Sequence, residues 1–348
     1  MSQKIAVAMS GGVDSSVVVL LLTEMGYEVA GLTLNLLDEA ENGELKSLSE
    51  QLMIAHSFVD ARREFYEKVV EPFASEYMAG RTPNPCIECN RHIKFGLLLD
   101  KALELGCGRI ATGHYVISEF DGESGRWLIR TAKDATKDQS YVLYTLSQKQ
   151  LSHALFPLGG LHKQEVKKIA LENGLSCAGK PESQDICFVP DGDYSGYIET
   201  RLGIKSPPGA FLDSDGNEIG PHKGLTHYTI GQRRGLGISS DRRIFVIDKD
   251  AASNTVTVGD EELLFAKRMT VSDVNWVSTA GVNEPVKALV KSRYRQAAQP
   301  ATLHPVSQNR VIVEFNTPQR ALTPGQSAVF YDGDVVLGGG KICRGDEF

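Results

Sequence analysis

One short stretch near the N-terminus, residues 4–16 (KIAVAMSGGVDSS), constrains the fold of this chain more than any other. Residues 5–9 form an apolar run typical of a buried strand, and a helical pattern runs from Val13 to a C-cap at Gly26. A Ser-Gly-Gly turn joins the two. Because glycines allow close backbone approach and the first N–H groups of a helix lack partners, this turn predicts an anion site.

The type of anion site follows from what the turn contains. It lacks the lysine of a GxxxxGK[ST] phosphate loop. It resembles instead the SGGxDSS loop of the ATP pyrophosphatases, which transfer AMP to an oxygen and release pyrophosphate. The resemblance implies that ATP is the ligand. The residues that it places at ATP are Ala8, Met9, Ser10, Gly11, Gly12, Val13, Asp14 and Ser15.

Length and composition exclude several classes of protein. The 348 residues suffice for two or three domains, and no window approaches the ~18 apolar residues of a membrane span. The N-terminus does not have the pattern of a signal peptide, so we expect a cytoplasmic protein without a membrane partner. Six cysteines then favour thiol or metal chemistry over a disulfide framework. The net charge of −7 leaves nucleic-acid binding open, because a local basic face suffices.

The order of elements predicts an α/β fold. Helical and apolar segments alternate over about 180 residues, which is typical of a doubly wound parallel sheet, and the loop resemblance makes it an adenine nucleotide alpha hydrolase-like one. Ligands of such sheets bind at the carboxyl ends of strands, here near Ser10, Leu34 and Gly113. The further segments expected are strands 28–34, 55–59, 109–112 and 127–130, helices 62–80, 92–105, 147–155 and 162–173, and an exposed loop 38–49 leading into a short helix from about 47.

The pattern changes beyond residue 196. Glycine and proline become frequent and short β-like runs replace helices, which predicts a small mixed middle domain over 197–268 after a catalytic domain over 1–196. Residues 269–348 have a β pattern throughout, and we expect a C-terminal β-barrel. Its six strands are expected at 270–277, 286–294, 301–306, 310–315, 327–331 and 335–338.

Three of the cysteines lie in segments that the sequence predicts to be loops. Cys86 and Cys89 form a C-x-x-C pair in the proline-rich segment 81–90, and Cys187 lies in segment 181–190. The three thiols could form a sulfur relay, in which one carries a persulfide and another drives its transfer. They could instead hold a metal or an iron–sulfur cluster, or be incidental. Composition alone does not separate the first two alternatives.

Eight segments occur in an order that resembles the tRNA-specific 2-thiouridylases. They are SGGVDSS, RTPNPCIECNRHIKFG (81–96), ATGHY (111–115), KDQSYVLY (137–144), SQDICFV (183–189), YTIGQRRGLGI (228–238), RYRQ (293–296) and TPGQ (323–326). This family replaces O2 of the wobble uridine with sulfur in tRNAs for Lys, Glu and Gln. The resemblance implies ATP, Mg²⁺, a tRNA partner, and a sulfur donor such as a cysteine desulfurase or a sulfur-relay protein.

The resemblance also implies a role for individual residues. Cys89 corresponds to the catalytic nucleophile and Cys187 to the persulfide carrier, and the two form a transient disulfide when sulfur leaves. Leu34 and Gly113 correspond to positions at the nucleotide. The stretch that meets the target base is Asn84, Pro85 and Cys86, and the tRNA contacts are His114, Lys137, Asp138, Gln139, Arg293, Tyr294 and Gln326.

Other interpretations stay open at several of these positions. Many members of the family have Asp, assigned as a base, where this chain has Cys86, and a thiol is a poorer base at neutral pH. Cys86 thereby favours the alternative of an iron–sulfur cluster held by Cys86, Cys89 and Cys187, in the same reaction or in a protein that only binds a cluster. A ligase that adenylylates a carboxylate is a nearer alternative. The glycine-flanked pair Arg233 and Arg234 suits either an RNA-binding loop or a hairpin turn with solvated charges.

Overall fold

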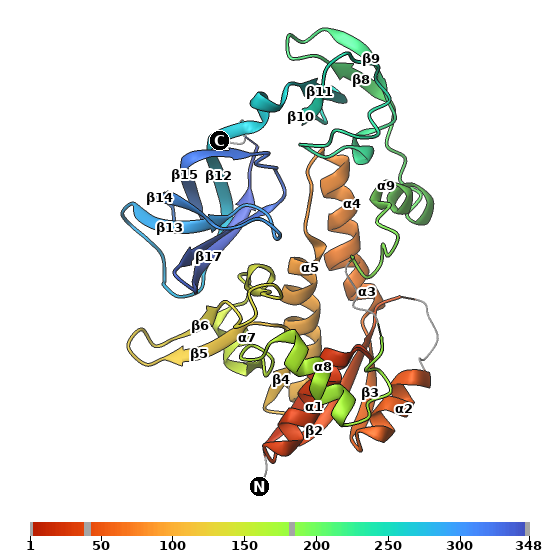
Figure 1. The fold of residues 1–348 in the computed structure, drawn as a ribbon, viewed down its shortest axis with the longest axis vertical. Coiled ribbons are helices and arrows are strands. Elements are labelled where there is room, and N and C mark those ends of the chain that lie inside the picture. The colour runs from red at the N-terminus through yellow and green to blue at the C-terminus, as the bar shows by residue number, and fades with distance from the viewer. Residues whose placement is uncertain (1–2, 38–42, 181–184, 345–348) are drawn as a thin grey trace.

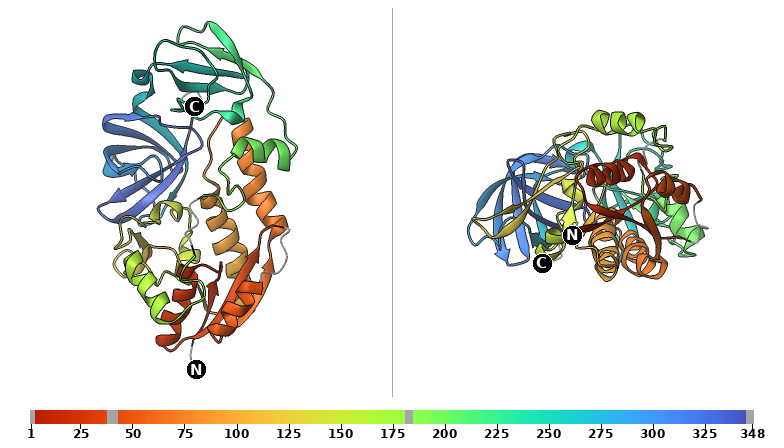
Figure 2. Two further views of the ribbon diagram at one scale, coloured as in Figure 1. Left: turned by 45° about the vertical axis from the view of Figure 1, so that its right-hand side comes forward. Right: turned by 90° about the horizontal axis from the view of Figure 1, so that it is seen from below.

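The computed structural model describes residues 3–37, 43–180 and 185–344, and it contains three units (Figure 1). The α/β unit lies at one end of the molecule and a small four-stranded sheet at the other. The C-terminal barrel lies beside both, as two further views show (Figure 2). Within the described part of the chain, no helix is long and apolar enough to cross a membrane.

The N-terminal unit is a five-stranded parallel sheet in the order β3-β2-β1-β4-β7. The chain moves outward from β1 to β2 and β3, and then returns to place β4 on the other side of β1. Ile5 and Val7 of β1 pack in a core with α1, whereas Ala6 faces the core that contains α6. The predicted doubly wound sheet is therefore confirmed. Its elements are β1 (Lys4–Ala8), α1 (Val13–Glu24), β2 (Glu28–Asn35), α2 (Gly43–Gln51), β3 (Ala55–Asp60), α3 (Arg62–Phe65), η1 (Tyr66–Val70), α4 (Glu71–Met78), α5 (Pro85–Glu88), η2 (Cys89–Leu97), α6 (Leu98–Glu104), β4 (Arg109–Ala111), β5 (Ile117–Asp121), β6 (Arg126–Arg130), η3 (Ser140–Val142), α7 (Gln148–His153), β7 (Ala154–Leu155) and α8 (Lys163–Glu172).

The expected loop over residues 81–90 is confirmed for 81–84 and wrong for 85–90. The short helix α5 begins at Pro85 and continues into the π-helical segment η2, so Cys86 and Cys89 both lie on a helix. Asn84 is the N-cap: its side-chain oxygen accepts a hydrogen bond from the Cys86 backbone N–H at 3.2 Å. Proline is favoured at the first helical position, where no N–H is needed, so the Asn-Pro pair starts this helix.

The two other expected loops lie partly outside the described residues. Helix α2 begins at Gly43, earlier than the start near 47 that the polar composition suggested. Residues 38–42 of the expected acidic loop, and residues 181–184 of the segment before Cys187, lie outside the described residues.

The rest of the chain forms two β units. Four strands form a sheet in the order β10-β11-β8-β9, and six more close into a barrel through pairing of β12 with both β15 and β17. The predicted C-terminal barrel is confirmed. The elements are α9 (Tyr194–Gly196), η4 (Tyr197–Arg201), β8 (Gly209–Leu212), β9 (Glu218–His222), η5 (Leu225–His227), β10 (Phe245–Asp250), β11 (Thr255–Gly259), η6 (Glu261–Leu264), β12 (Phe265–Trp276), β13 (Val286–Lys291), β14 (Gln299–Ser307), β15 (Arg310–Arg320), β16 (Ser327–Asp332) and β17 (Val335–Ile342).

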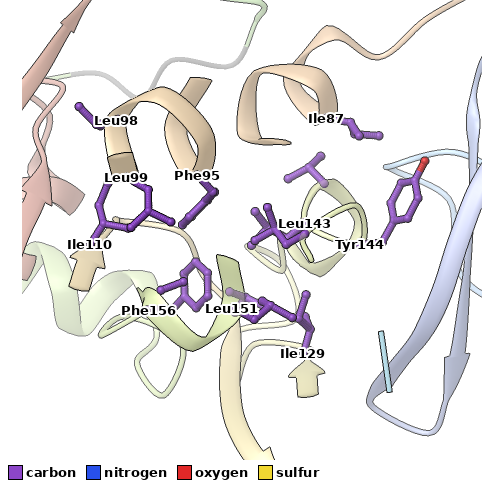
Figure 3. Close-up of a cluster of buried hydrophobic side chains, with 14 of the residues drawn as sticks. Ile87, Phe95, Leu98, Leu99, Ile110, Ile129, Leu143, Tyr144, Leu151 and Phe156 are labelled. Atoms are coloured by element: carbon purple, nitrogen blue, oxygen red, sulfur yellow. The ribbon is translucent and has the colours of Figure 1, made fainter. Parts of the chain in front are cut away.

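The α/β unit and the barrel share a hydrophobic core. Ile87 of α5 and Phe95 of η2 lie in the same cluster as Leu143 and Tyr144, as the close-up shows (Figure 3). Val329, Tyr331 and Val336 of the barrel belong to this cluster. The β5–β6 hairpin also joins the barrel sheet, through pairing of β6 with β17. Burial of this much apolar surface fixes the barrel against the helix that carries Cys86 and Cys89.

Candidate active site

The glycine-rich turn leaves the start of α1 open to an anion. Gly12 is the N-cap and provides no side-chain cap. The first backbone hydrogen bond of the helix runs from the Ser16 N–H to the Gly12 carbonyl at 3.3 Å. The hydroxyl groups of Ser15 and Ser16 also donate to that carbonyl, so they point back into the turn. The N–H groups of the first turn therefore face outward with the helix dipole behind them.

The ends of β2 and β4 lie beside this turn. In the parallel register Ala8 pairs with Leu32, which places Leu34 at the carboxyl edge where β1 ends. Gly113 follows β4 and lies against the turn so closely that a Cβ atom on it would be 2.9 Å from Cβ of Asp14. Only glycine allows this approach. The structure thus brings Leu34 and Gly113 to the turn, at the edge where open α/β sheets bind ligands.

Two residues that the sequence analysis missed hold Asp14. The Lys163 ammonium lies 2.6 and 2.8 Å from the two carboxylate oxygens of Asp14. The Tyr115 hydroxyl donates to the same carboxylate at 2.8 Å. Both residues come from distant parts of the chain, the first from the start of α8 and the second from the segment after Gly113. Tyr115 was quoted only as part of the ATGHY segment, and nothing local in the sequence identifies Lys163.

The structure also gathers the cysteines expected to react. All six cysteines carry free thiols. Cys89 is buried in a cluster with Phe188, the neighbour of Cys187, and Leu34 packs against the same cluster. Cys86 and Cys187 are exposed. The helix that carries Cys86 and Cys89, the cysteine helix, therefore shares a cluster with the segment of Cys187 and with Leu34 at the carboxyl edge of the sheet.

Burial raises the pKa of all three thiols. The effect is largest for Cys89, whose pKa rises to about 12. Burial also raises the pKa of Cys86 and of Cys187, although part of each side chain is exposed to solvent. The Cys187 thiolate would raise the pKa of Cys89 further, as expected for neighbours, and the Lys94 charge opposes these shifts. Lys94 is a further residue that the sequence analysis did not single out.

This electrostatic pattern predicts the order of thiol reactivity. Because only the thiolate reacts with iodoacetamide, a raised pKa moves the labelling of each cysteine to higher pH. We expect Cys89 to label more slowly than Cys187 at every pH up to about 10. In Lys94→Gln all three thiols should label several-fold more slowly at pH 8, because a charge that favours the thiolate is lost. Peptide mass spectrometry measures each rate.

Lys101→Gln is the matched control, because Lys101 is an exposed lysine of the same helical stretch, paired with Glu104 at 2.8 Å. It should leave all three rates unchanged. Equal labelling of Cys89 and Cys187 near neutral pH would contradict the burial of the Cys89 thiol.

The alternative of an iron–sulfur cluster needs three cysteine ligands that lie close together. Across residues 3–37, 43–180 and 185–344, no three His, Cys, Asp or Glu side chains are arranged to hold a metal ion. Cys86, Cys89 and Cys187 thus do not form such a set in this conformation.

Several residues that are expected to contact tRNA are buried or make hydrogen bonds within the protein. The Asp138 carboxylate is buried and accepts hydrogen bonds from two backbone N–H groups and from Ser140. The Gln139 side chain accepts from the Tyr115 N–H at 2.9 Å. His114 is buried against Phe95, and burial lowers its pKa well below the usual range, so its ring is neutral at pH 7. His114 is thus a buried residue whose ring is hydrogen-bonded to Thr112 within the protein.

The barrel residues that are expected to contact tRNA also link the barrel to the other units of the protein. One nitrogen of the Arg293 guanidinium donates to carbonyls of Ile230 and Ala321 and to the Thr323 hydroxyl, which links the middle unit to the barrel. Tyr294 is exposed, and its hydroxyl donates to the Asp138 carbonyl. Lys137 is half-buried in the same KDQS turn.

Gln326 positions the chain just before the cysteine helix. Its side-chain amide donates to the Thr82 carbonyl at 2.7 Å, and the Thr82 N–H donates to the Pro324 carbonyl at 2.9 Å. The TPGQ turn of the barrel therefore holds the RTPN segment that ends in the Asn84 cap. An ion pair between Lys341 and Glu88 at 3.2 Å adds a second link between the barrel and α5.

Comparison with known proteins places the chain in a family. A family model described as "tRNA methyl transferase HUP domain" matches residues 3–191. Models described as "tRNA methyl transferase PRC-barrel domain" and "Aminomethyltransferase beta-barrel domain" match residues 195–260 and 266–342. The chain is 48% identical to tRNA-specific 2-thiouridylase MnmA 2 of Thermoanaerobacter sp. (strain X514), over 99% of this chain and 98% of that protein. The chain belongs to the tRNA-specific 2-thiouridylase family.

Other 2-thiouridylases match over the same extent. Identity is 47% to tRNA-specific 2-thiouridylase MnmA 1 of Caldanaerobacter subterraneus subsp. tengcongensis, over 98% of each chain. It is 45% to the 2-thiouridylase of Pelotomaculum thermopropionicum, over 99% of each chain. The resemblance seen in the eight sequence segments is thereby confirmed. Although the family models are described by methyl transfer, the full-length relatives are thiouridylases.

Proposed function

We propose that this protein is an ATP-dependent tRNA-uridine 2-sulfurtransferase that acts on the wobble uridine of tRNAs for Lys, Glu and Gln. The observation that carries the proposal is the shared cluster of Cys89 and Phe188, against which Leu34 packs at the nucleotide edge. Two cysteine segments beside a pyrophosphatase-type loop fit a reaction that first activates an oxygen and then replaces it with sulfur. The proposal includes a cytoplasmic location.

The first step activates the uridine. A carbonyl oxygen is a poor leaving group, so O2 attacks the α-phosphorus of ATP and pyrophosphate departs, which leaves an adenylylated base. The open N–H groups at the start of α1 would hold the phosphates, and Gly113 leaves room beside them. Asp14 is a carboxylate at this site that fits Mg²⁺, which would neutralise the charge of the triphosphate. Mg²⁺ is part of the proposal.

The second step transfers sulfur. A sulfur donor loads Cys187 as a persulfide, and the terminal sulfur attacks C2 of the activated uridine. The C2–O2 bond breaks and AMP leaves with that oxygen. The Cys89 thiolate then attacks the Cys187 sulfur, the S–S bond of the persulfide breaks, and its electron pair stays on the sulfur at C2. The products are 2-thiouridine and a Cys89–Cys187 disulfide, which a thiol reductant must reopen before the next turnover.

The resting structure requires one change before this second step. The pKa of Cys89 near 12 keeps its thiol protonated at neutral pH, so the thiolate forms only when substrate alters its surroundings. Cys86 cannot replace the Asp base of other family members in this state, because burial raises its pKa as well. The proton of the uridine therefore leaves to another group or to solvent.

The loop of Arg233 and Arg234 offers a surface for tRNA. Both side chains are exposed, in a loop rather than a strand hairpin. Replacing both with Ala should weaken tRNA binding and lower the slope of log affinity against log salt by about 0.7–0.9 per lost phosphate contact. Filter-binding titrations at several KCl concentrations, from about 50 to 300 mM, measure both the affinity for tRNA and its dependence on salt. If affinity fell with no change of slope, these arginines would not contact phosphates.

The activity itself is tested with tRNA, ATP, Mg²⁺ and a persulfide source, with and without oxygen, by nucleoside mass spectrometry. Formation of 2-thiouridine under both conditions would support the persulfide route. Formation only without oxygen, in protein that carries iron, would instead support a cluster. If no 2-thiouridine forms and a small carboxylic acid drives ATP–pyrophosphate exchange, the protein is a ligase and the proposal is wrong.

A further inference from the structure

The segment that follows β4 is bound by a glutamine of the KDQS turn. Residues 112–116 belong to no helix or strand, so their buried backbone groups need partners from other segments. Tyr115 is 3% exposed, and Gln139 binds both of its backbone groups. The Tyr115 N–H donates to the Gln139 side-chain oxygen, and the Gln139 N–H donates to the Tyr115 carbonyl, each at 2.9 Å. Gln139 therefore fixes the backbone of Tyr115.

Tyr115 in turn contacts the glycine-rich turn. Its hydroxyl donates to the carboxylate of Asp14, the second residue of α1, at 2.8 Å. Gly113, two residues before Tyr115, lies so close to Asp14 that a Cβ atom on it would be 2.9 Å from the Asp14 Cβ. Because residues 113 and 115 both contact Asp14, a displacement of Tyr115 would change the geometry of the anion site at the start of α1.

The barrel holds the KDQS turn through a buried carboxylate. The Asp138 side chain is 5% exposed, and the ammonium of Lys291, at the end of β13, lies 3.4 Å from one of its oxygens. The same ammonium lies over the Tyr331 ring, 5.5 Å from the ring centre. Since a buried carboxylate is costly without a nearby positive charge, Lys291 stabilises Asp138 in this position.

Two further hydrogen bonds join the turn to the barrel. The Ser140 hydroxyl donates to the Asp138 carboxylate at 2.8 Å and lies 3.2 Å from the Tyr331 hydroxyl. The Tyr294 hydroxyl donates to the Asp138 carbonyl at 3.3 Å. Gln139 lies between Asp138 and Ser140 in the chain, so residues that contact the barrel hold its backbone on both sides.

We propose that Gln139 is a positioning residue of the ATP site and that Lys291 of the barrel fixes it in place. The contacts run from the barrel to the KDQS turn, then to Tyr115, and from Tyr115 to Asp14. This role rests on the proposed function, because ATP is taken as the ligand of the glycine-rich turn. It differs from the contact with tRNA that the family resemblance implies for Asp138 and Gln139.

Gln139→Met removes the acceptor of the Tyr115 N–H with little change in side-chain size. It should weaken ATP binding about five- to thirtyfold and change tRNA binding less than about twofold, because a buried N–H loses its partner beside the ATP site. Calorimetry with Mg²⁺ measures ATP binding by the full chain, and filter binding of a tRNA for Glu that lacks 2-thiouridine measures tRNA binding. The KM for ATP in thiolation should rise by the same factor, with kcat within about threefold of the original.

Gln139→Glu separates positioning from a contact with tRNA. Glutamate keeps an oxygen that accepts the Tyr115 N–H, so ATP affinity should stay within about threefold of that of the unchanged protein. If Gln139 instead contacted tRNA phosphates, the added negative charge would weaken tRNA binding and leave ATP binding unchanged, which would overturn the proposal. Gln308→Met is the matched control and should leave both affinities unchanged, because Gln308 is exposed in the turn between β14 and β15.

Lys291→Met tests the contribution of the barrel. Loss of the ammonium beside Asp138 should weaken ATP binding about two- to fivefold, whereas Lys291→Arg, which keeps the charge, should retain the affinity. Lys287→Met is the control, because Lys287 is an exposed lysine on the same strand. Equal ATP affinity in Lys291→Met and Lys287→Met would overturn the role of the barrel, and this comparison decides the question if Gln139→Met does not fold.

The remaining outcomes separate this role from the proposed function. Equal losses of ATP and tRNA affinity in Gln139→Met would mean that Gln139 only stabilises the fold, and would overturn the proposal. If the unchanged protein bound no ATP, the proposed function itself would be wrong. If it bound ATP and Gln139→Met bound it equally well, only the role of Gln139 would be wrong.

Discussion

Cys187→Ser should abolish formation of 2-thiouridine, by at least about a thousandfold, while ATP and tRNA still bind. A serine hydroxyl cannot carry the persulfide sulfur, so the second step has no donor. Cys187 is exposed, and replacing sulfur by oxygen there removes little packing. The variant should therefore still adenylylate tRNA and release pyrophosphate. Single-turnover nucleoside mass spectrometry measures the first result, and a pyrophosphate assay measures the second.

Cys343→Ser provides the control for this variant. Cys343 is partly exposed, follows the last strand of the barrel, and its thiol contacts the Lys341 carbonyl at 3.8 Å. It should retain full activity. Repeated turnover by Cys187→Ser with a protein sulfur donor would show that another thiol carries the sulfur. Loss of both pyrophosphate release and thiolation would show that Cys187 acts before sulfur transfer.

The sequence was most informative where local pattern determines structure. The SGG turn between an apolar run and a helical pattern predicted the β1–α1 unit, and periodicity predicted the helix from Arg62 and the strands of the barrel. The prediction for residues 85–90 is wrong because proline is typical of loops as well as of helix starts. Pro85 stands directly after Asn84, and an Asn-Pro pair is also a helix start. The sequence therefore contains a signal for a helix start at Asn84 and Pro85, but the two prolines of the segment also favour a loop.

The parts of the site that the sequence could not predict depend on contacts between distant segments. Lys163 and Asp14 are separated by 149 positions, and Gln326 and Thr82 by 244. Neither spacing follows from local periodicity. The family resemblance named Gln326 as a tRNA contact, and the structure gives its amide a partner within the protein. A residue that holds the cysteine helix can affect tRNA modification without touching tRNA.

The barrel therefore has a role beyond any surface it offers to tRNA. Its TPGQ turn binds the RTPN segment, Lys341 pairs with Glu88, and Tyr144 donates or accepts a hydrogen bond with Ser327 at 2.9 Å. The first two links reach the start of the helix that carries Cys86 and Cys89, and Tyr144 lies in the same core cluster as Ile87 of that helix. Because misplacement of a reacting group by about 1 Å can cost about a hundredfold in rate, the barrel should influence thiolation through this helix.

Gly325→Ala tests that role and should slow thiolation about ten- to a hundredfold with ATP affinity unchanged. Gly325 has φ of +87°, and a Cβ atom there would lie 2.8 Å from the Thr82 backbone nitrogen and 2.9 Å from Cβ of Arg81. Since backbone cannot yield as a flexible side chain does, the RTPN segment must shift. The shift displaces the Asn84 cap and the cysteine helix behind it, whereas the glycine-rich loop lies on another element. Single-turnover thiolation and ATP calorimetry measure the two effects.

Gly333→Ala separates displacement from backbone strain. Gly333 lies in the turn between β16 and β17 with φ of +58°, and a Cβ atom there meets nothing within 4 Å. Both variants should lose about 1–2 kcal/mol of stability from a left-handed alanine, seen as a lower Tm. Only Gly325→Ala should also lose thiolation, because only its Cβ atom touches the segment that starts the cysteine helix. Equal thiolation by the two variants would mean that the barrel does not position Cys89, and that its contribution to the reaction lies elsewhere.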